Sequence, residues 1–95
     1  MNYLEATAER IRSLIPANNM PDNAEALLLS YAVLARAKGR DTTAEDVHDA
    51  WTAWMLLRGE DHESMRPFNE LSPEVQEEDL PFLRAIHQVA SSGQH

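Results

Sequence analysis

Apolar residues recur along the first part of the chain at the spacing of an α-helix. Leu4, Ala8, Ile11 and Ile15 follow one another at intervals of four, three and four residues, so they share one helical face. Pro16 should end this segment, because proline lacks the backbone N–H that a helix interior needs. The pattern predicts an amphipathic helix that covers the core with one face.

The second segment is apolar on most of its sides. Its central part, ALLLSYAVLARA, is interrupted only by Ser30 and Arg36. Such a helix is usually the central one of a small domain, because the other helices cover it. We expect Asp22 to cap its start, with Glu25 completing a capping box, and Gly39 to end it in the left-handed conformation.

A third helix is predicted after Thr43, a residue type well suited to cap a helix. Gly59 should end this helix, and a polar loop, residues 60–66, follows. Five side chains recur between these two points at helical spacing: Val47, Ala50, Trp51, Trp54 and Arg58.

Ser72 followed by Pro73 predicts the start of a fourth helix, because proline at the first helical position gives up no useful N–H. Pro81 should kink this helix or restart it. No segment shows the alternation of a strand. The sequence therefore predicts one all-α domain, residues 1–95, with four helices. The second helix is central, and the C-terminal helix is kinked near Pro81.

The charge and composition of the chain limit the classes of partner that it is expected to bind. The chain has 95 residues, no cysteine and a formal net charge of −8. Nucleic-acid affinity is built mainly from Lys and Arg, so this charge argues against a nucleic-acid partner. No apolar run is long enough to span a bilayer, and the N-terminus lacks the pattern of a secretory signal. We therefore expect a cytoplasmic protein with no membrane partner.

The sequence carries no signature of catalysis or of a metal site. His62-Glu63 resembles the start of the zinc motif H-E-x-x-H, but Arg66 stands where the second histidine is needed. Glu74, Glu77 and Glu78 fall on a predicted solvent face, whereas a catalytic carboxyl pair needs one desolvated member. We expect no catalytic residue, no metal, no cofactor and no enzymatic activity.

An ordered set of short motifs runs through residues 47–84. Val47-His48-Asp49-Ala50-Trp51 opens it, and after a variable loop come His62-Glu63 and then Pro67-Phe68. Leu71-Ser72-Pro73-Glu74 comes next, and Asp79 lies in the final helix. This order resembles the ryanodine-receptor-type repeat, in which V-H-x-x-W precedes His-Pro, Pro-Tyr or Pro-Phe, L-S/P-x-E and Asp-Arg. Glu63 stands in place of the family's proline, and Leu80 in place of its arginine. The chain also looks like small proteins of actinobacteria and their phages.

The resemblance implies an interaction or sensing module and not a catalyst. Because the repeats of the receptor pack as pairs, it also implies that a lone copy could form a homodimer. Our first hypothesis is protein–protein interaction through a face that carries Trp54 and the His62–Phe68 loop. If the chain comes from a phage, its partner would be a host protein, whose identity the sequence does not give.

The second hypothesis is a small-ligand sensor, for a nucleotide for example. Its pocket would be bounded by His48, Trp51, His62 and Arg84, and the hypothesis requires these side chains to converge in a concave site. A third alternative, a nucleic-acid mimic, is weaker, because helical periodicity scatters the carboxylates between Glu70 and Asp79.

Each candidate also has a purely structural interpretation. Trp51 is expected in the core, whereas Trp54 is equally suited to the core and to a binding surface. His48 gains chemical interest only if His62 or Asp79 converges on it. Phe68 should anchor the loop, so that Phe68→Ala costs about 3–5 kcal/mol of stability. The candidate binding residues are His48, Trp51, Trp54, His62, Glu63, Pro67, Phe68 and Arg84.

Overall fold

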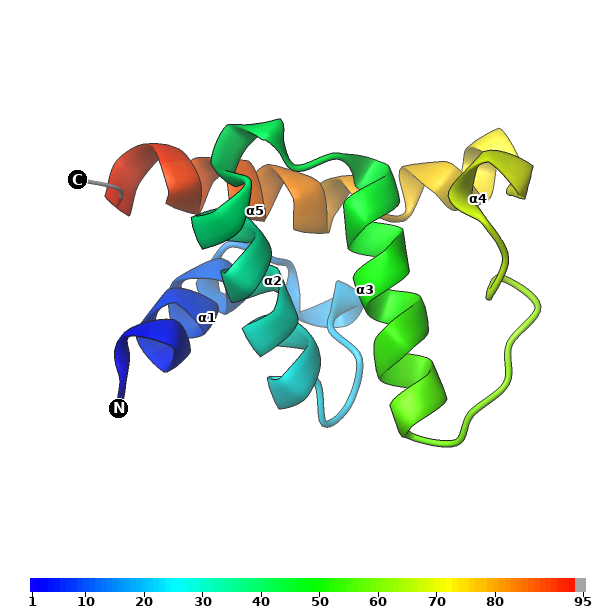
Figure 1. Cartoon of the computed structure of the whole chain (residues 1–95), viewed down its shortest axis with the longest axis horizontal. Coiled ribbons are helices and arrows are strands. Elements are labelled where there is room, and N and C mark those ends of the chain that lie inside the picture. The colour runs from blue at the N-terminus through cyan, green and yellow to red at the C-terminus, as the bar shows by residue number, and fades with distance from the viewer. Residues whose placement is uncertain (94–95) are drawn as a thin grey trace.

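The computed structural model describes residues 1–93, and within that range the chain folds into helices without a strand (Figure 1). The predicted all-α fold is confirmed. The α-helices are α1 (Tyr3–Ser13), α2 (Glu25–Ala37), α3 (Ala44–Leu57), α4 (Pro73–Glu77) and α5 (Leu80–Gly93). Three short 3-10 turns join them: η1 (Ala17–Asn19), η2 (Gly39–Asp41) and η3 (Phe68–Glu70).

Helix α2 lies at the centre of the domain, as its apolar sequence predicts. It packs against α1, α3 and α5. The largest fully buried side chains come from all four of these helices: Ile11, Leu27, Tyr31, Val47, Ile86 and Val89. The cover is incomplete on one side, where Leu29 and Val33 keep 37% and 49% of their surface exposed. Helix α2 is therefore central to the core and also contributes an apolar strip to the surface.

Local signals in the sequence place the ends of α3 as predicted. The Thr43 hydroxyl accepts a hydrogen bond from the Asp46 backbone N–H, and the Asp46 carboxylate accepts one from the Thr43 N–H. Such a reciprocal pair satisfies two N–H groups that the first helical turn leaves free. Gly39 and Gly59 follow α2 and α3 with φ of 57° and 71°, which glycine adopts without strain.

The start of α2 differs from the prediction. The helix begins at Glu25, with Ala24 at its N-cap and no capping side chain. Asn23 lies between Asp22 and the helix with φ of 57°, and this left-handed residue forms a tight turn. The turn separates Asp22 from the first helical residue, so Asp22 is in no position to cap the helix.

The C-terminal helical segment is bent, in agreement with the prediction for Pro81. Helix α4 ends at Glu77, α5 begins at Leu80, and residues 73–92 are bent by 32°. Pro81 has no N–H to donate to the carbonyl of Glu77, so the regular helical ladder is interrupted there. The break places Asp79 at the junction of the two helices.

A long loop between α3 and α4 returns along the outer side of α3 (Figure 1). Its η3 turn contacts α3. The Gln76 side-chain amide donates hydrogen bonds to the carbonyl oxygens of Phe68 and Leu71, over 3.0 and 3.1 Å. This arrangement leaves a gap between the loop and α2, which becomes the candidate site. No helix within residues 1–93 is both long and apolar enough to cross a bilayer.

Candidate functional site

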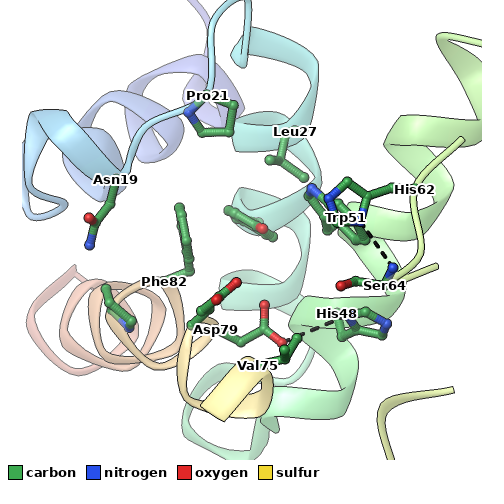
Figure 2. Close-up of a pocket in the computed structure, with 13 residues that line it drawn as sticks. Asn19, Pro21, Leu27, His48, Trp51, His62, Ser64, Val75, Asp79 and Phe82 are labelled. Carbon is green, nitrogen blue, oxygen red and sulfur yellow. Dashed lines mark hydrogen bonds and ion pairs between the residues drawn. The ribbon is translucent and has the colours of Figure 1, made fainter. Parts of the chain in front are cut away.

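A pocket of about 370 Å³ opens between α2, α3, the α3–α4 loop and the junction of α4 and α5 (Figure 2). Its apolar wall consists of Pro21, Leu27, Trp51, Val75, Pro81 and Phe82. Its polar lining consists of Asn19, Tyr31, His48, His62, Ser64, Glu78 and Asp79. Apolar walls with a few convergent polar groups are typical of small-ligand sites in proteins.

His48 holds the loop to α3 and presents its second nitrogen to Asp79. The ring is 3% exposed, and its Nε2 lies 2.7 Å from the carbonyl oxygen of Arg66. A carbonyl oxygen only accepts, so Nε2 carries a proton and donates it. The Nδ1 atom lies 3.8 Å from the Oδ2 atom of Asp79, a distance too long for a hydrogen bond, and the two groups form an ion pair only when the ring is protonated.

Asp79 is an acid in a largely desolvated position. Its side chain is 15% exposed. Burial raises the pKa of the Asp79 carboxyl from 3.8 to about 6, His48 opposes the rise, and the neighbouring Glu78 carboxylate adds to it. Desolvation thus outweighs the attraction of the nearby imidazole. At neutral pH Asp79 is mainly a carboxylate, held close to a histidine that does not donate to it.

Tyr31 contributes a buried hydroxyl to the same space. The residue is 2% exposed, and its ring lies 5.7 Å from that of Phe82, centroid to centroid. Burial raises the pKa of the Tyr31 hydroxyl, and the negative charge of Asp79, which lines the same pocket, raises it further. Tyr31 lines the pocket, and its hydroxyl is not one of the fully buried polar atoms that lack a partner within residues 1–93, so a ligand in the pocket can reach it.

Trp51 and His62 form the wall on the loop side (Figure 2). Their rings meet edge to face with centroids 5.5 Å apart, and the His48 ring lies 5.6 Å from Trp51 on the other side. The backbone N–H of Ser64 donates to Nδ1 of His62 over 3.0 Å. When the His62 ring is neutral, its proton is therefore on Nε2.

The structure resolves the alternative left open for Trp54 and differs from the expectation of a core position for Trp51. Trp54 is 6% exposed and belongs to the core, and the Arg58 guanidinium covers its ring at 4.3 Å from the centroid. Trp51 is only partly buried and lines the pocket. An exposed anchor at Trp54 is therefore ruled out, because its surface is already occupied within the chain.

A sequence profile described as a domain of unknown function, DUF7701, matches residues 2–91. The chain belongs to the DUF7701 family. The match includes every residue that lines the pocket, so the site lies within the DUF7701 domain itself. Neither a curated protein nor a solved structure matches the chain. The resemblance to ryanodine-receptor-type repeats stays a prediction.

The DUF7701 fold brings together three of the four residues predicted to bound a ligand site. His48, Trp51 and His62 converge on the pocket, whereas Arg84 is exposed on α5 and does not line it. Glu63 and Pro67 are exposed residues of the loop outside the pocket. Phe68 is partly buried and does not line the pocket. Its ring centroid lies 6.1 Å from that of His48, so it packs beside one of the lining residues.

The sequence did not predict the lining residues that η1, α2 and α5 contribute to this DUF7701 pocket. Asn19, Tyr31 and Phe82 come from η1, α2 and α5, and none of them belongs to a recognisable motif. One signal was available for Tyr31, because a hydroxyl in an almost wholly apolar helix needs a polar partner when it is buried. Asp79 was considered only as a potential partner of His48, and the structure supplies that contact.

The electrostatic character of the DUF7701 pocket is acidic. Glu78 and Asp79 line it, and no Lys or Arg is among its lining residues. Phosphate recognition in proteins relies on arginine, lysine or backbone N–H groups that match the anion's charge. Within the described chain, no three side chains of the His, Asp and Glu types gather as a metal site requires. The pocket therefore suits a neutral or positively charged organic group.

Proposed function

We propose that this DUF7701 domain binds a small organic molecule in the pocket between α2, α3 and α5, as a sensing module without catalytic activity. The convergence of His48, Trp51 and His62 with Tyr31 and Asp79 around one concave space carries the proposal. A volume of 370 Å³ is within the range of roughly 300–1,000 Å³ that is typical of small-ligand sites.

Binding without chemistry is favoured by how the histidines are engaged. His48 donates from Nε2 to the Arg66 carbonyl, and its Nδ1 already faces Asp79. A general base needs a nitrogen within reach of a substrate proton or of a nucleophile. Ser64, the serine of the pocket lining, contributes its backbone N–H to His62, and its hydroxyl pairs with neither histidine. The lining therefore supports recognition of a ligand better than its conversion.

The outer wall of the pocket supports a sensing role. Helix α4 makes no extensive contact with another helix in the described chain, and the loop before it is attached to α3 mainly through η3 and His48. Segments with few packed contacts open at low free-energy cost. A ligand that contacts α2 and the loop together would fix this wall and so change the surface that a partner meets.

A fragment screen by ligand-detected NMR tests the proposal directly. Compounds that bind the full chain should lose affinity at least tenfold in Trp51→Ala and keep it in Leu57→Ala, which alters an equally apolar residue of α3 that is 89% exposed. Absence of any binder, or binders that respond equally to both variants, would count against a ligand site at this pocket.

A second candidate function is interaction with another protein or with a second copy of the chain. Four exposed apolar residues on α2 and at the end of α3 favour it: Leu29, Val33, Leu56 and Leu57. Trp54 no longer contributes, and capture of a host protein by a phage-encoded chain stays a prediction. Light scattering after size-exclusion chromatography tests the homodimer. A dimer of the native chain that becomes a monomer in Leu57→Glu would support it, and a native monomer would exclude it at the concentration used.

A further inference from the structure

We propose that the ligand of this pocket is an organic cation, a protonated amine carried on a flat apolar group. The inference rests on the proposed function and names the ligand class for the same site. It starts from three polar groups that meet in the pocket without satisfying one another.

The carboxylate of Asp79, the hydroxyl of Tyr31 and the Nδ1 atom of His48 are the three groups. The Asp79–His48 distance of 3.8 Å exceeds a hydrogen bond, and Tyr31 lines the pocket with a hydroxyl that is not a fully buried orphan within residues 1–93, so a ligand can reach it. Because Nε2 of His48 donates to Arg66, Nδ1 of the neutral ring is an acceptor. The pocket thus presents three acceptors, and a primary ammonium group has three donors.

The charges around the pocket also favour a positively charged ligand. Asp79 and Glu78 approach it from the α4–α5 junction, His48 from α3, His62 from the loop and Tyr31 from α2. No Lys or Arg neutralises the two carboxylates from within the lining. A desolvated carboxylate without a donor is unfavourable, and a bound cation would remove that penalty by supplying both charge and hydrogen bonds.

The apolar wall of the pocket indicates that the part of the ligand attached to the ammonium group is flat and apolar. Trp51 and Phe82 are partly buried aromatic residues on opposite sides of the pocket, from α3 and α5 (Figure 2). Aromatic faces attract cations and also pack against flat apolar groups. Pro21, Leu27 and Val75 extend this apolar wall around the same pocket of about 370 Å³. An arylalkylamine combines these features, whereas a nucleotide would place phosphates against two carboxylates.

Isothermal titration calorimetry of the full chain at pH 7.5 tests the ligand class with three probes of matched shape. These are phenethylamine, the uncharged 2-phenylethanol and the anion 3-phenylpropionate. We expect the amine to bind at least tenfold more tightly than the alcohol, and the anion to bind weakest. Equal or tighter binding of the alcohol or the anion would overturn the proposal.

Three variants locate the cation within the pocket. Asp79→Asn should weaken amine binding at least tenfold and leave 2-phenylethanol binding nearly unchanged. Tyr31→Phe should weaken amine binding less, because it removes a neutral acceptor. Glu74→Gln, which removes an exposed acid of α4 outside the lining, is the matched control and should bind like the native chain. Unchanged amine binding in Asp79→Asn would refute the assignment, and circular dichroism of each variant establishes that it is folded.

Two further outcomes separate this inference from the proposed function. If the fragment screen finds pocket ligands but none is an amine, the ligand class is wrong and the binding function stands. If no small compound binds at all, the proposed function itself fails. A lysine probe, Nα-acetyl-lysine amide, distinguishes the source of the ammonium group. Tighter binding of this probe than of phenethylamine would support ammonium recognition but overturn the aryl part of the ligand and assign the group to a protein side chain.

Discussion

The Nδ1 atom of His48 lies 3.8 Å from the Oδ2 atom of Asp79, across the gap between α3 and the start of α5. The contact joins residues that are far apart in the sequence and that both line the candidate pocket. The Asp79 carboxylate is largely desolvated there, and no group within residues 1–93 donates a hydrogen bond to it. Several measurable properties depend on that carboxylate.

The first prediction concerns stability and pH. Because the pKa of Asp79 is about 6 in the folded chain and 3.8 ordinarily, the folded state binds more protons between these values. The contribution of Asp79 to stability is therefore most favourable below pH 4 and is lost as the pH rises through 6. Asp79→Asn should raise the melting temperature relative to the native chain at pH 7.5 and change it little at pH 4, as thermal denaturation would show.

Asp46 provides a control, because its pKa is shifted in the opposite direction to that of Asp79. The hydrogen bond from Lys38, followed by the bond from the Thr43 backbone, lowers the pKa of the Asp46 carboxyl. Its contribution to stability is present at neutral pH and is lost as the pH falls through the lowered value. Asp46→Asn should thus lower the melting temperature at pH 7.5. The same direction of change in both variants at that pH would contradict the pH account.

The second prediction separates the two tryptophans. Trp54→Ala should lower the free energy of unfolding by about 3–5 kcal/mol, because it empties a core position that is 6% exposed. Trp51→Ala should lower it less, because its ring is already partly open to the pocket. Urea denaturation of both variants measures the difference. A larger loss in Trp51→Ala would place Trp51 in the core, as the sequence first suggested.

The third prediction concerns the loop. Removing the bond from His48 Nε2 to the Arg66 carbonyl with His48→Leu should lower the free energy of unfolding by about 1–3 kcal/mol. The loop should then be cut faster by a protease that cleaves after glutamate, at Glu60 or Glu63. Asn69→Ala changes an exposed residue of η3 and should leave the cleavage rate nearly unaltered. Equal cleavage of the His48 variant and the native chain would mean that this bond does not hold the loop.

The fourth prediction revises the expectation for Phe68. A cost of about 3–5 kcal/mol applies to a ring that is fully buried, but Phe68 is only partly buried beside His48. We expect Phe68→Ala to lower the free energy of unfolding by about 2 kcal/mol. Ile86→Ala, at a position that is 0% exposed, is the comparison and should cost about 2–5 kcal/mol. Equal or greater destabilisation by Phe68→Ala would show that the loop is part of the core.

Local signals were enough to predict the helical frame. Thr43, Gly39 and Pro81 act through their own backbone chemistry, so their effects could be read without knowing the fold. The start of α2 was misplaced because the left-handed turn at Asn23 is only one of several conformations open to Asp-Asn.

The candidate site depended on tertiary structure. Trp51 and Trp54 share a helical face, and only the placement of Arg58 and of the loop decides which ring is covered. Tyr31 is predicted to be buried, but its position beside Asp79 follows from how α5 crosses α2. Arg84 was predicted to bound the same pocket as the histidines, but it is exposed on α5 outside the pocket.

The most direct test of ligand binding uses the two tryptophans of the chain, whose indole N–H groups give two separate signals in a ¹⁵N-correlated NMR spectrum. Phenethylamine would be titrated into the full chain at pH 7.5. We predict that the Trp51 signal shifts saturably while that of Trp54, which is buried in the core, stays in place. A Trp51 signal that does not move, or that moves no more than that of Trp54, would contradict the account.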